Sequence, residues 1–297
     1  MTAPAPAKGL IALLRLPYWL MTGGLSLLTA FAITKNPTDL SAQTILLIFF
    51  SMAFITSAGF AINDYFDRES DAVIKPKRPI PSGSLSLRQV VAVSSMLFTA
   101  GLIMAFFINW LSFTIIASDS ALLLVYSTIV KRKSGFAANV LVGILTGTAF
   151  LFGEATISSP PTVSIISLSL YPIALGTVGG NILRDVLSID GDSKTGYPTL
   201  PQKIGINDSA KVAAGFFLLT GLLVPLPFFV GDGNFDFFYL VPILVWSVLL
   251  IYSSIRLATA SSNVLNVRKY ERVITMSMIL LPLALILEAV SHMIGGL

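Results

Sequence analysis

Two short acidic segments hold the side chains of this 297-residue chain that could do chemistry. The first runs from Asn63 to Asp71 and the second from Asp185 to Asp192, and each directly follows a long apolar stretch. Acidic groups next to hydrocarbon are costly, so they are usually kept for function. Oxygen ligands at the ends of membrane helices predict bound Mg²⁺ and a phosphorylated lipid substrate.

The first segment has helical spacing. Asn63, Asp67 and Asp71 are four residues apart, and residues at this spacing share one face of a helix. The three side chains therefore predict a polar stripe that extends the preceding membrane helix. Asp64 lies beside this stripe, and whether it takes part in metal binding stays open.

The second segment has the same property. Asn181, Asp185, Ser188 and Asp192 are separated by four, three and four residues, which predicts a second stripe. Two such stripes that face each other would form an oxygen-rich cage for Mg²⁺, which usually shares its ligands with substrate phosphates. The predicted metal ligands are Asn63, Asp67, Asp71, Asp185 and Asp192, and the four carboxylates among them are the predicted catalytic residues.

Basic residues close to both segments would suit a diphosphate. They are Lys75, Lys77 and Arg78 after the first segment, residues 131–133 at the end of an apolar stretch, and Lys194 and Lys203 after the second segment. Membrane topology alone would explain each of them, because cytoplasmic loops carry an excess of Lys and Arg.

The composition is that of a polytopic membrane protein. Hydrophobic residues make up 55% of the chain and charged residues only 11%, against about 25% charged residues in soluble domains. The chain has no cysteine, which excludes disulfides and thiolate metal sites. Its one histidine, His292, excludes a metal centre with several histidines.

Apolar stretches long enough to cross a membrane predict an all-α integral membrane protein, with nine transmembrane helices in one bundle and a single domain over residues 1–297. The expected spans are 10–33, 42–62, 89–108, 111–130, 136–156, 163–184, 209–230, 237–257 and 272–292. Only Asn109 and Trp110 separate the third span from the fourth, so eight helices are the alternative.

The basic residues indicate the orientation. With nine helices, 18 of the 19 Lys and Arg residues fall on the face that holds the N-terminus and both acidic segments, and only Lys35 falls on the other. The positive-inside rule then places the N-terminus and the active site on the cytoplasmic side of the cell membrane.

Three further ionisable residues lie in apolar stretches, where such groups are candidates for function. Arg15 could bind a phosphate on the acceptor. Asp119, in the middle of a predicted helix, is expected to make a structural contact between helices, and Glu288 is expected at the membrane interface.

Residues 63–71, NDYFDRESD, resemble the NDxxDxxxD signature of the UbiA superfamily of membrane prenyltransferases. Residues 75–83, KPKRPIPSG, resemble the K-P-x-R-P-I/L-P-S-G run that follows it in the family. Tyr126, Lys131 and Asn139 fit its Y…LKR…N pattern, and the second acidic segment is followed by a match to G-x-x-S/T-L-P at residues 196–201. These matches occur in the family's order, and the predicted helices extend the agreement over the full chain.

The resemblance implies transfer of a prenyl group from its diphosphate to a lipid-like acceptor, with two Mg²⁺ ions bridging the diphosphate. It also implies that Arg78, Lys131 and Lys194 stabilise the diphosphate. The other predicted substrate-binding residues are Tyr126, Asn139, Arg15, Asn181 and Ser188. One position departs from the pattern: many members have Asp where this chain has Ser188, which leaves the ligand count of the second ion open.

Within the superfamily, the first motif and the loop after it are most similar to the archaeal digeranylgeranylglyceryl phosphate synthases. This similarity implies transfer of a geranylgeranyl group to the free hydroxyl of geranylgeranylglyceryl phosphate, a step of ether-lipid synthesis. An aromatic quinone precursor or chlorophyllide is the alternative acceptor, and a transporter is a remote alternative. The interactions expected are with prenyl diphosphate, the acceptor and membrane lipid, with no nucleic acid and no obligatory protein partner; prenyl chain length and oligomeric state stay open.

Overall fold

The computed structural model of the chain describes residues 6–34, 40–157, 163–189, 193, 198–230, 235–259 and 264–295. Every regular element within these ranges is a helix, which confirms the all-α class. The chain divides into two compact units, of which unit 1 comprises Met1–Leu27 and Ser41–Val130, and unit 2 comprises Leu28–Leu40 and Lys131–Leu297.

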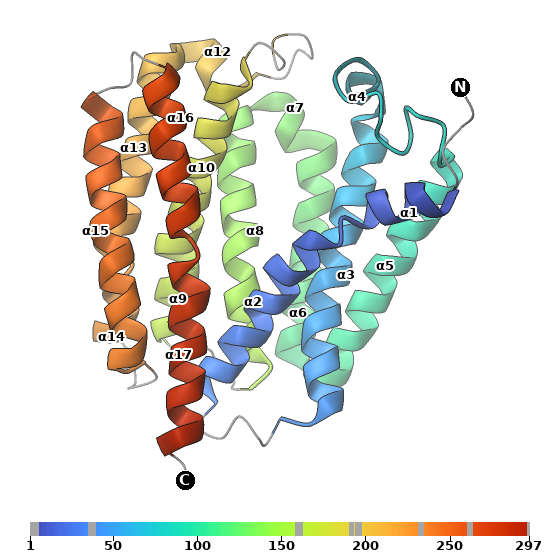
Figure 1. Cartoon of the computed structure of the whole chain (residues 1–297). Helices are drawn as coiled ribbons and strands as arrows, with labels where there is room; N and C mark the ends of the chain where they lie inside the picture. The colour runs from blue at the N-terminus through green and yellow to red at the C-terminus, as the bar shows by residue number, and fades with distance from the viewer. Residues whose placement is uncertain are drawn as a thin grey trace. The chain divides into compact units, whose positions relative to one another are not determined.

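Unit 1 contains the first acidic segment. Its central helix is α3, which packs mainly against α5 and also against α6 and α1; α3 and α5 lie side by side in Figure 1. The elements of unit 1 are α1 (Pro6–Leu14), α2 (Pro17–Ile33, which ends in unit 2), α3 (Ala42–Phe66), α4 (Arg68–Ile74), α5 (Leu87–Ile108), α6 (Trp110–Val125) and the π-helix η2 (Tyr126–Val130).

Unit 2 contains the second acidic segment. Its α10 packs against α8 and α13, and α15 packs against α13, α16 and α17 (Figure 1). The elements are α7 (Lys131–Lys133), α8 (Gly135–Ala155), α9 (Val163–Leu168), the π-helix η3 (Ser169–Ile173), α10 (Ala174–Leu187), α12 (Leu200–Ile204), α13 (Ile206–Leu223), α14 (Leu226–Phe229), α15 (Phe237–Thr259), α16 (Val264–Ser277) and α17 (Leu280–Gly295).

Short polar side chains begin several of these helices by accepting hydrogen bonds that the first helical turn cannot satisfy itself. At α5, Ser86 and Gln89 bond reciprocally in a capping box. Asn109 ends α5, and its Oδ1 accepts from the backbone N–H of Ser112 at 2.7 Å to begin α6. The hairpin expected at Asn109 and Trp110 is therefore confirmed, and one residue makes the turn.

The predicted span 10–33 is interrupted, which the sequence analysis did not foresee. Arg15 has a φ of 50° and separates α1 from α2, a conformation that costs a non-glycine residue roughly 1–3 kcal/mol. The carbonyl of Leu14 at this break is not orphaned, since it accepts from Ser57 Oγ of α3 at 2.6 Å and from Trp19 Nε1 at 3.2 Å. The side chain of Arg15 contacts Asp64 of the first acidic segment, and this contact holds Arg15 in its unusual backbone conformation.

Eight helices in the described ranges are long and apolar enough to cross a membrane. The chain is therefore a multi-pass membrane protein. The segment predicted as a span over residues 163–184 forms α9, η3 and α10 instead of one uninterrupted α-helix. Pro172 lies inside η3, and because proline has no N–H to donate, a π-helical turn replaces the regular hydrogen bonds there.

Close backbone packing holds this interrupted segment against α8. A Cβ atom on Gly143 would lie 2.6 Å from the carbonyl oxygen of Ala174, and one on Gly147 would meet the carbonyl oxygen of Ser169. Small residues at membrane helix interfaces let backbones approach in this way. α10, which carries Asn181 and Asp185, is thereby placed against α8.

Candidate functional site

The first acidic segment continues the helical path of α3, as predicted. The N–H of Asp67 donates to the carbonyl of Asn63 at 2.8 Å, and the N–H of Asp71 donates to the carbonyl of Asp67 at 2.8 Å. Asp67 lies at the junction between α3 and α4, and both Asp67 and Asp71 are buried. The stripe of Asn63, Asp67 and Asp71 is therefore present, and it does not face bulk solvent.

A compact loop after α4 returns Arg78 to this stripe. The N–H of Arg78 donates to Lys75 O at 2.9 Å, and the buried Pro79 has a carbonyl that accepts from Ser84 Oγ at 3.0 Å and from the Leu85 N–H at 3.1 Å. Leu85 belongs to a buried cluster with Leu13, Ala61 and Val90, on α1, α3 and α5. Apolar packing under the loop thus fixes the position of Arg78.

Two arginines neutralise part of the buried acidic charge. Nη1 of Arg78 lies 3.0 Å from Asp64 Oδ1 and 2.5 Å from Asp71 Oδ2. Nη2 of Arg15 lies 2.6 Å from the same Asp64 oxygen, and the Arg15 guanidinium covers the ring of Phe60 at 4.3 Å from its centroid. Removing one partner from a buried pair costs roughly 3–5 kcal/mol, because the other charge is left uncompensated.

Asp64 is the site residue that the sequence analysis left undecided. It is 3% exposed, and it is the one residue here that contacts both arginines. Its spacing of three residues from Asp67 and seven from Asp71 places it on the same helix face. That spacing was the signal that could have assigned it.

Asn63 and Asp67 together provide a place for a hard cation. Nδ2 of Asn63 donates to Asp67 Oδ2 at 2.8 Å, so the amide oxygen points elsewhere. That oxygen, Oδ1, is buried and accepts no hydrogen bond from any described residue. A buried acceptor without a donor suits a metal ion, and Mg²⁺ prefers oxygen ligands such as this amide and the carboxylates of Asp67 and Asp71.

The described ranges contain no group of three His, Cys, Asp or Glu side chains arranged to hold a metal. The donor set of unit 1 is smaller, with two carboxylates and one amide oxygen. Such a set still fits Mg²⁺, which usually binds one or two carboxylates and completes its shell with water and substrate phosphates.

The second acidic segment begins on α10 of unit 2. Oδ2 of Asp185 accepts a hydrogen bond of 2.8 Å from Nδ2 of Asn139 on α8, so the structure brings these two predicted residues together. Asn181 Oδ1 accepts from Nη1 of Arg184 at 3.2 Å, and Ser188 ends α10. Asp192 and Lys194, both predicted site residues, lie outside the described residues.

Tyr126 and Lys131 lie on successive turns of one helical path. Tyr126 begins η2 at the end of unit 1, Lys131 begins α7 in unit 2, and both are half-buried. A π-helical turn adds a residue to the α-helical path and often marks a functional site. At the start of α8 the N–H of Gly135 donates to Pro198 O at 3.0 Å, which anchors the residues just before α12 to α8.

Two other acids in apolar stretches are buried within the protein. Asp119 is buried in α6, and its expected structural role stays a prediction. Glu288 is 0% exposed, and its two oxygens accept from the N–H groups of Asp236 at 3.0 Å and Tyr239 at 3.1 Å. Its expected position at the membrane interface also stays a prediction.

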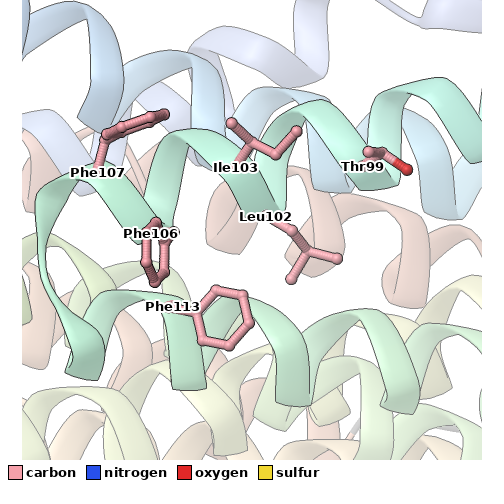
Figure 2. Close-up of a pocket in the computed structure, with 6 residues that line it drawn as sticks. All are labelled: Thr99, Leu102, Ile103, Phe106, Phe107 and Phe113. Atoms are coloured by element: carbon pink, nitrogen blue, oxygen red, sulfur yellow. The ribbon is translucent and has the colours of Figure 1, made fainter.

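An apolar groove of about 380 Å³ lies on unit 1, and none of the predicted site residues lines it. Figure 2 shows its lining, which comes from α5 except for Phe113 on α6. Phe106 and Phe107 are 57% and 69% exposed, as expected for a surface that meets lipid. The groove has no charged lining residue, and Thr99 is the one polar residue in its lining.

The UbiA prenyltransferase family model matches residues 20–281 of the chain. The digeranylgeranylglyceryl phosphate synthase of Natronomonas pharaonis is 36% identical over 234 residues, which is 79% of this chain and 82% of the relative. The protein of the same name from Methanopyrus kandleri is 37% identical over 229 residues, 77% of this chain and 81% of the relative.

Solved structures agree over nearly the full chain. A structure of digeranylgeranylglyceryl phosphate synthase has a TM-score of 0.81 and 27% identity, and covers 96% of this chain and 99% of its own. A UbiA homologue from Archaeoglobus fulgidus, solved with DMAPP and Mg²⁺, has a TM-score of 0.67 over 94% of this chain and 99% of its own. At 20% identity the latter similarity shows the fold alone.

Proposed function

Because the chain belongs to the UbiA prenyltransferase family, we propose that it transfers a geranylgeranyl group from its diphosphate to the free hydroxyl of geranylgeranylglyceryl phosphate. This is the step of archaeal ether-lipid synthesis for which its relatives are named. The similarity to those relatives extends over about four fifths of their length. The solved synthase structure supports the same assignment, since it matches nearly every part of the chain.

The observation that carries the proposal is the polar cluster of unit 1. The carboxylates of Asp64, Asp67 and Asp71 are buried close together along one helical path, and the amide oxygen of Asn63 is buried without a donor among the described residues. A buried acceptor without a donor, next to carboxylates, suits a cation. A diphosphate with its Mg²⁺ would supply the cation and, at the same time, an anion for Arg78.

Magnesium, when bound, would neutralise the departing diphosphate and hold it in position. We propose that two ions bridge the diphosphate and that both acidic segments serve it. The proposed ligands are Asn63, Asp67, Asp71, Asp185 and Asp192.

The other predicted residues have proposed roles in binding. Arg78, Lys131 and Lys194 would stabilise the negative charge that develops on the diphosphate as the bond breaks. Asn139 positions Asp185 through their hydrogen bond. Arg15 would bind the phosphate of the acceptor with the guanidinium nitrogens that Asp64 leaves available. The remaining proposed contacts to substrate are Tyr126, Asn181 and Ser188.

The reaction replaces one C–O bond with another. The allylic C–O bond breaks as the diphosphate leaves with the bonding electrons, and the acceptor hydroxyl bonds to the same carbon and loses its proton. A strong base is not needed, because an allylic carbon that is losing diphosphate is highly electrophilic. This suits a chain without cysteine and with one histidine.

We also propose that both units act as one polytopic domain. In this arrangement the α9–η3–α10 segment is a ninth membrane crossing, and the N-terminus and both acidic segments lie on the cytoplasmic side of the cell membrane. The distribution of Lys and Arg along the chain supports this orientation. Cysteine accessibility on intact cells, with single cysteines introduced at Lys77 and Lys35, would test it, since only Lys35→Cys should be labelled from outside.

Purified protein in lipid would be given radiolabelled geranylgeranyl diphosphate with MgCl₂ or EDTA. The acceptors would be geranylgeranylglyceryl phosphate, 4-hydroxybenzoate and chlorophyllide, each tested alone. The expected result is Mg²⁺-dependent product with the glycerol phosphate acceptor only, abolished by Asp67→Ala. Product with either other acceptor would keep prenyl transfer but reject the proposed substrate, and absence of product with every acceptor would reject prenyl transfer.

A further inference from the structure

A shallow apolar groove runs along the outer surface of α15 in unit 2. It has a volume of about 320 Å³ and is lined by Leu244, Val245, Val248 and Leu249. Val245 and Val248 are 51% and 65% exposed, so the groove opens outward. In a membrane protein such a groove meets lipid chains.

The groove leads along the helix to a basic residue. Val245, Leu249, Tyr252 and Arg256 are spaced by four, three and four residues, which places them on one face. The 23 residues of α15 span about 34 Å at 1.5 Å per residue, slightly more than a hydrocarbon core of about 30 Å. Arg256, three residues from the end, therefore lies at the membrane interface, and Tyr252 lies one turn below it.

Arg256 is held in place by a buried tyrosine. Its Nε donates to the hydroxyl of Tyr270 on α16 at 3.2 Å, and Tyr270 is 5% exposed. Nζ of Lys269 lies 5.7 Å from the centroid of the same ring. Arg256 and Lys269 are both exposed, and within the described part of the chain the Nη groups of Arg256 have no partner. An anchored guanidinium with a free end is suited to binding a phosphate.

The surroundings carry more positive than negative charge, since Glu271 is the one acid among Arg268, Lys269 and Arg272. Arg268 and Arg272 are exposed on α16 and form no ion pair with any described residue. The carboxylate of Glu271 accepts from Thr275 Oγ1 at 3.1 Å, and residues 260–263, which join the two helices, include no acid. The ends of α15 and α16 therefore attract anions at the membrane surface.

We infer that the ends of α15 and α16 bind an anionic phospholipid of the surrounding membrane. Its phosphate lies between Arg256 and Lys269, and one of its chains lies in the groove of Val245, Val248 and Leu249. The groove on α5 and α6 (Figure 2) is apolar too, but residues 99–118, which line and flank it, include no charged side chain. It therefore lacks the basic residues that would bind a lipid phosphate. The site is independent of the proposed reaction.

The full chain in detergent would be titrated with phosphatidylglycerol or phosphatidylcholine, and bound lipid counted by native mass spectrometry. We expect one tightly retained phosphatidylglycerol. The double variant Arg256→Gln with Lys269→Gln should weaken its binding roughly 30-fold, the scale for two cations at a membrane surface. Arg88→Gln with Lys211→Gln removes two other exposed cations, and this control should bind phosphatidylglycerol like the unaltered chain. An equal loss in the control would overturn the inference.

Two variants keep the charge and test the built site. Tyr270→Phe removes only the hydroxyl that anchors Arg256 and should weaken binding roughly 3-fold, as for one hydrogen bond. Val248→Phe fills the groove and should weaken the retention of phosphatidylglycerol too. Millimolar inorganic phosphate should not displace the lipid. Displacement by phosphate, or full retention in both of these variants, would contradict a lipid site.

Discussion

In unit 1 the buried carboxylates of Asp64 and Asp71 meet the guanidinium groups of Arg15 and Arg78, whereas in unit 2 the buried carboxylate of Glu288 meets backbone N–H groups at the start of α15. Backbone donors at a helix N-terminus are fixed by the helix itself and have no other partner. Arginine side chains can exchange one anion for another when a substrate arrives.

The comparison separates a structural acid from functional ones. Both oxygens of Glu288 accept hydrogen bonds within the protein, so its carboxylate needs no cation. The cluster of unit 1 has a buried amide oxygen, Oδ1 of Asn63, that accepts no hydrogen bond from any described residue. A buried polar group that lacks a partner in the protein points to a ligand that provides one.

Removing the charge of Asp67, the proposed metal ligand next to Asn63, should have the largest effect. Asp67→Asn keeps the shape and the possible hydrogen bond with Asn63 but removes the charge that would hold the cation, so we expect a loss of roughly 10³-fold in kcat. The measurement is the transfer assay at saturating donor, acceptor and Mg²⁺. Glu288→Gln is the matched control, and its kcat should stay close to that of the unaltered chain. If kcat fell equally in Asp67→Asn and Glu288→Gln, the assignment of Asp67 to function and Glu288 to structure would be wrong.

Glu288→Ala tests whether Glu288 has a structural role. It leaves the N–H groups of Asp236 and Tyr239 buried without an acceptor, which should cost roughly 2 kcal/mol of the free energy of unfolding. The midpoint of thermal unfolding in detergent should fall, while kcat per folded molecule is preserved. A variant with unchanged thermal stability and reduced kcat would assign Glu288 to the chemistry instead.

The local part of the site could be predicted from the sequence. Helical spacing placed Asn63, Asp67 and Asp71 on one face, and the hydrogen bonds between their backbones follow from that spacing. The same argument could have included Asp64. Its two partners could not be found in this way, because Arg15 lies 49 residues away and reaches Asp64 only through the break between α1 and α2.

Two further features could not be found from the sequence. The backbone groups that donate to Glu288 belong to Asp236 and Tyr239, 52 and 49 residues away. The segment 163–184 was expected as one membrane span because it is an apolar stretch long enough to cross a membrane. Periodicity reports which face is apolar, and it does not report where Pro172 forces a π-helical turn.

Asn63→Ala should have a smaller effect than Asp67→Asn, and on a different quantity. It removes one neutral oxygen ligand and the donor that orients Asp67, so the Mg²⁺ concentration for half-maximal activity should rise roughly tenfold. A magnesium titration of the transfer rate measures this, and kcat at saturating Mg²⁺ should fall less than in Asp67→Asn. An unchanged magnesium requirement would remove Asn63 from the proposed ligands.

Ser188 should matter least of the residues considered. The residue ends α10 through a backbone hydrogen bond from its N–H to Arg184 O at 3.0 Å, and any side chain can make that bond. Its hydroxyl could contribute one neutral hydrogen bond to a water at the site, so Ser188→Ala should lower kcat roughly 3-fold. Ser188→Asp restores the acid found in many family members and should lower the Mg²⁺ requirement. If Ser188→Ala lowered kcat as much as Asp67→Asn does, Ser188 would have to bind the metal ion directly, and the small effect predicted here would be wrong.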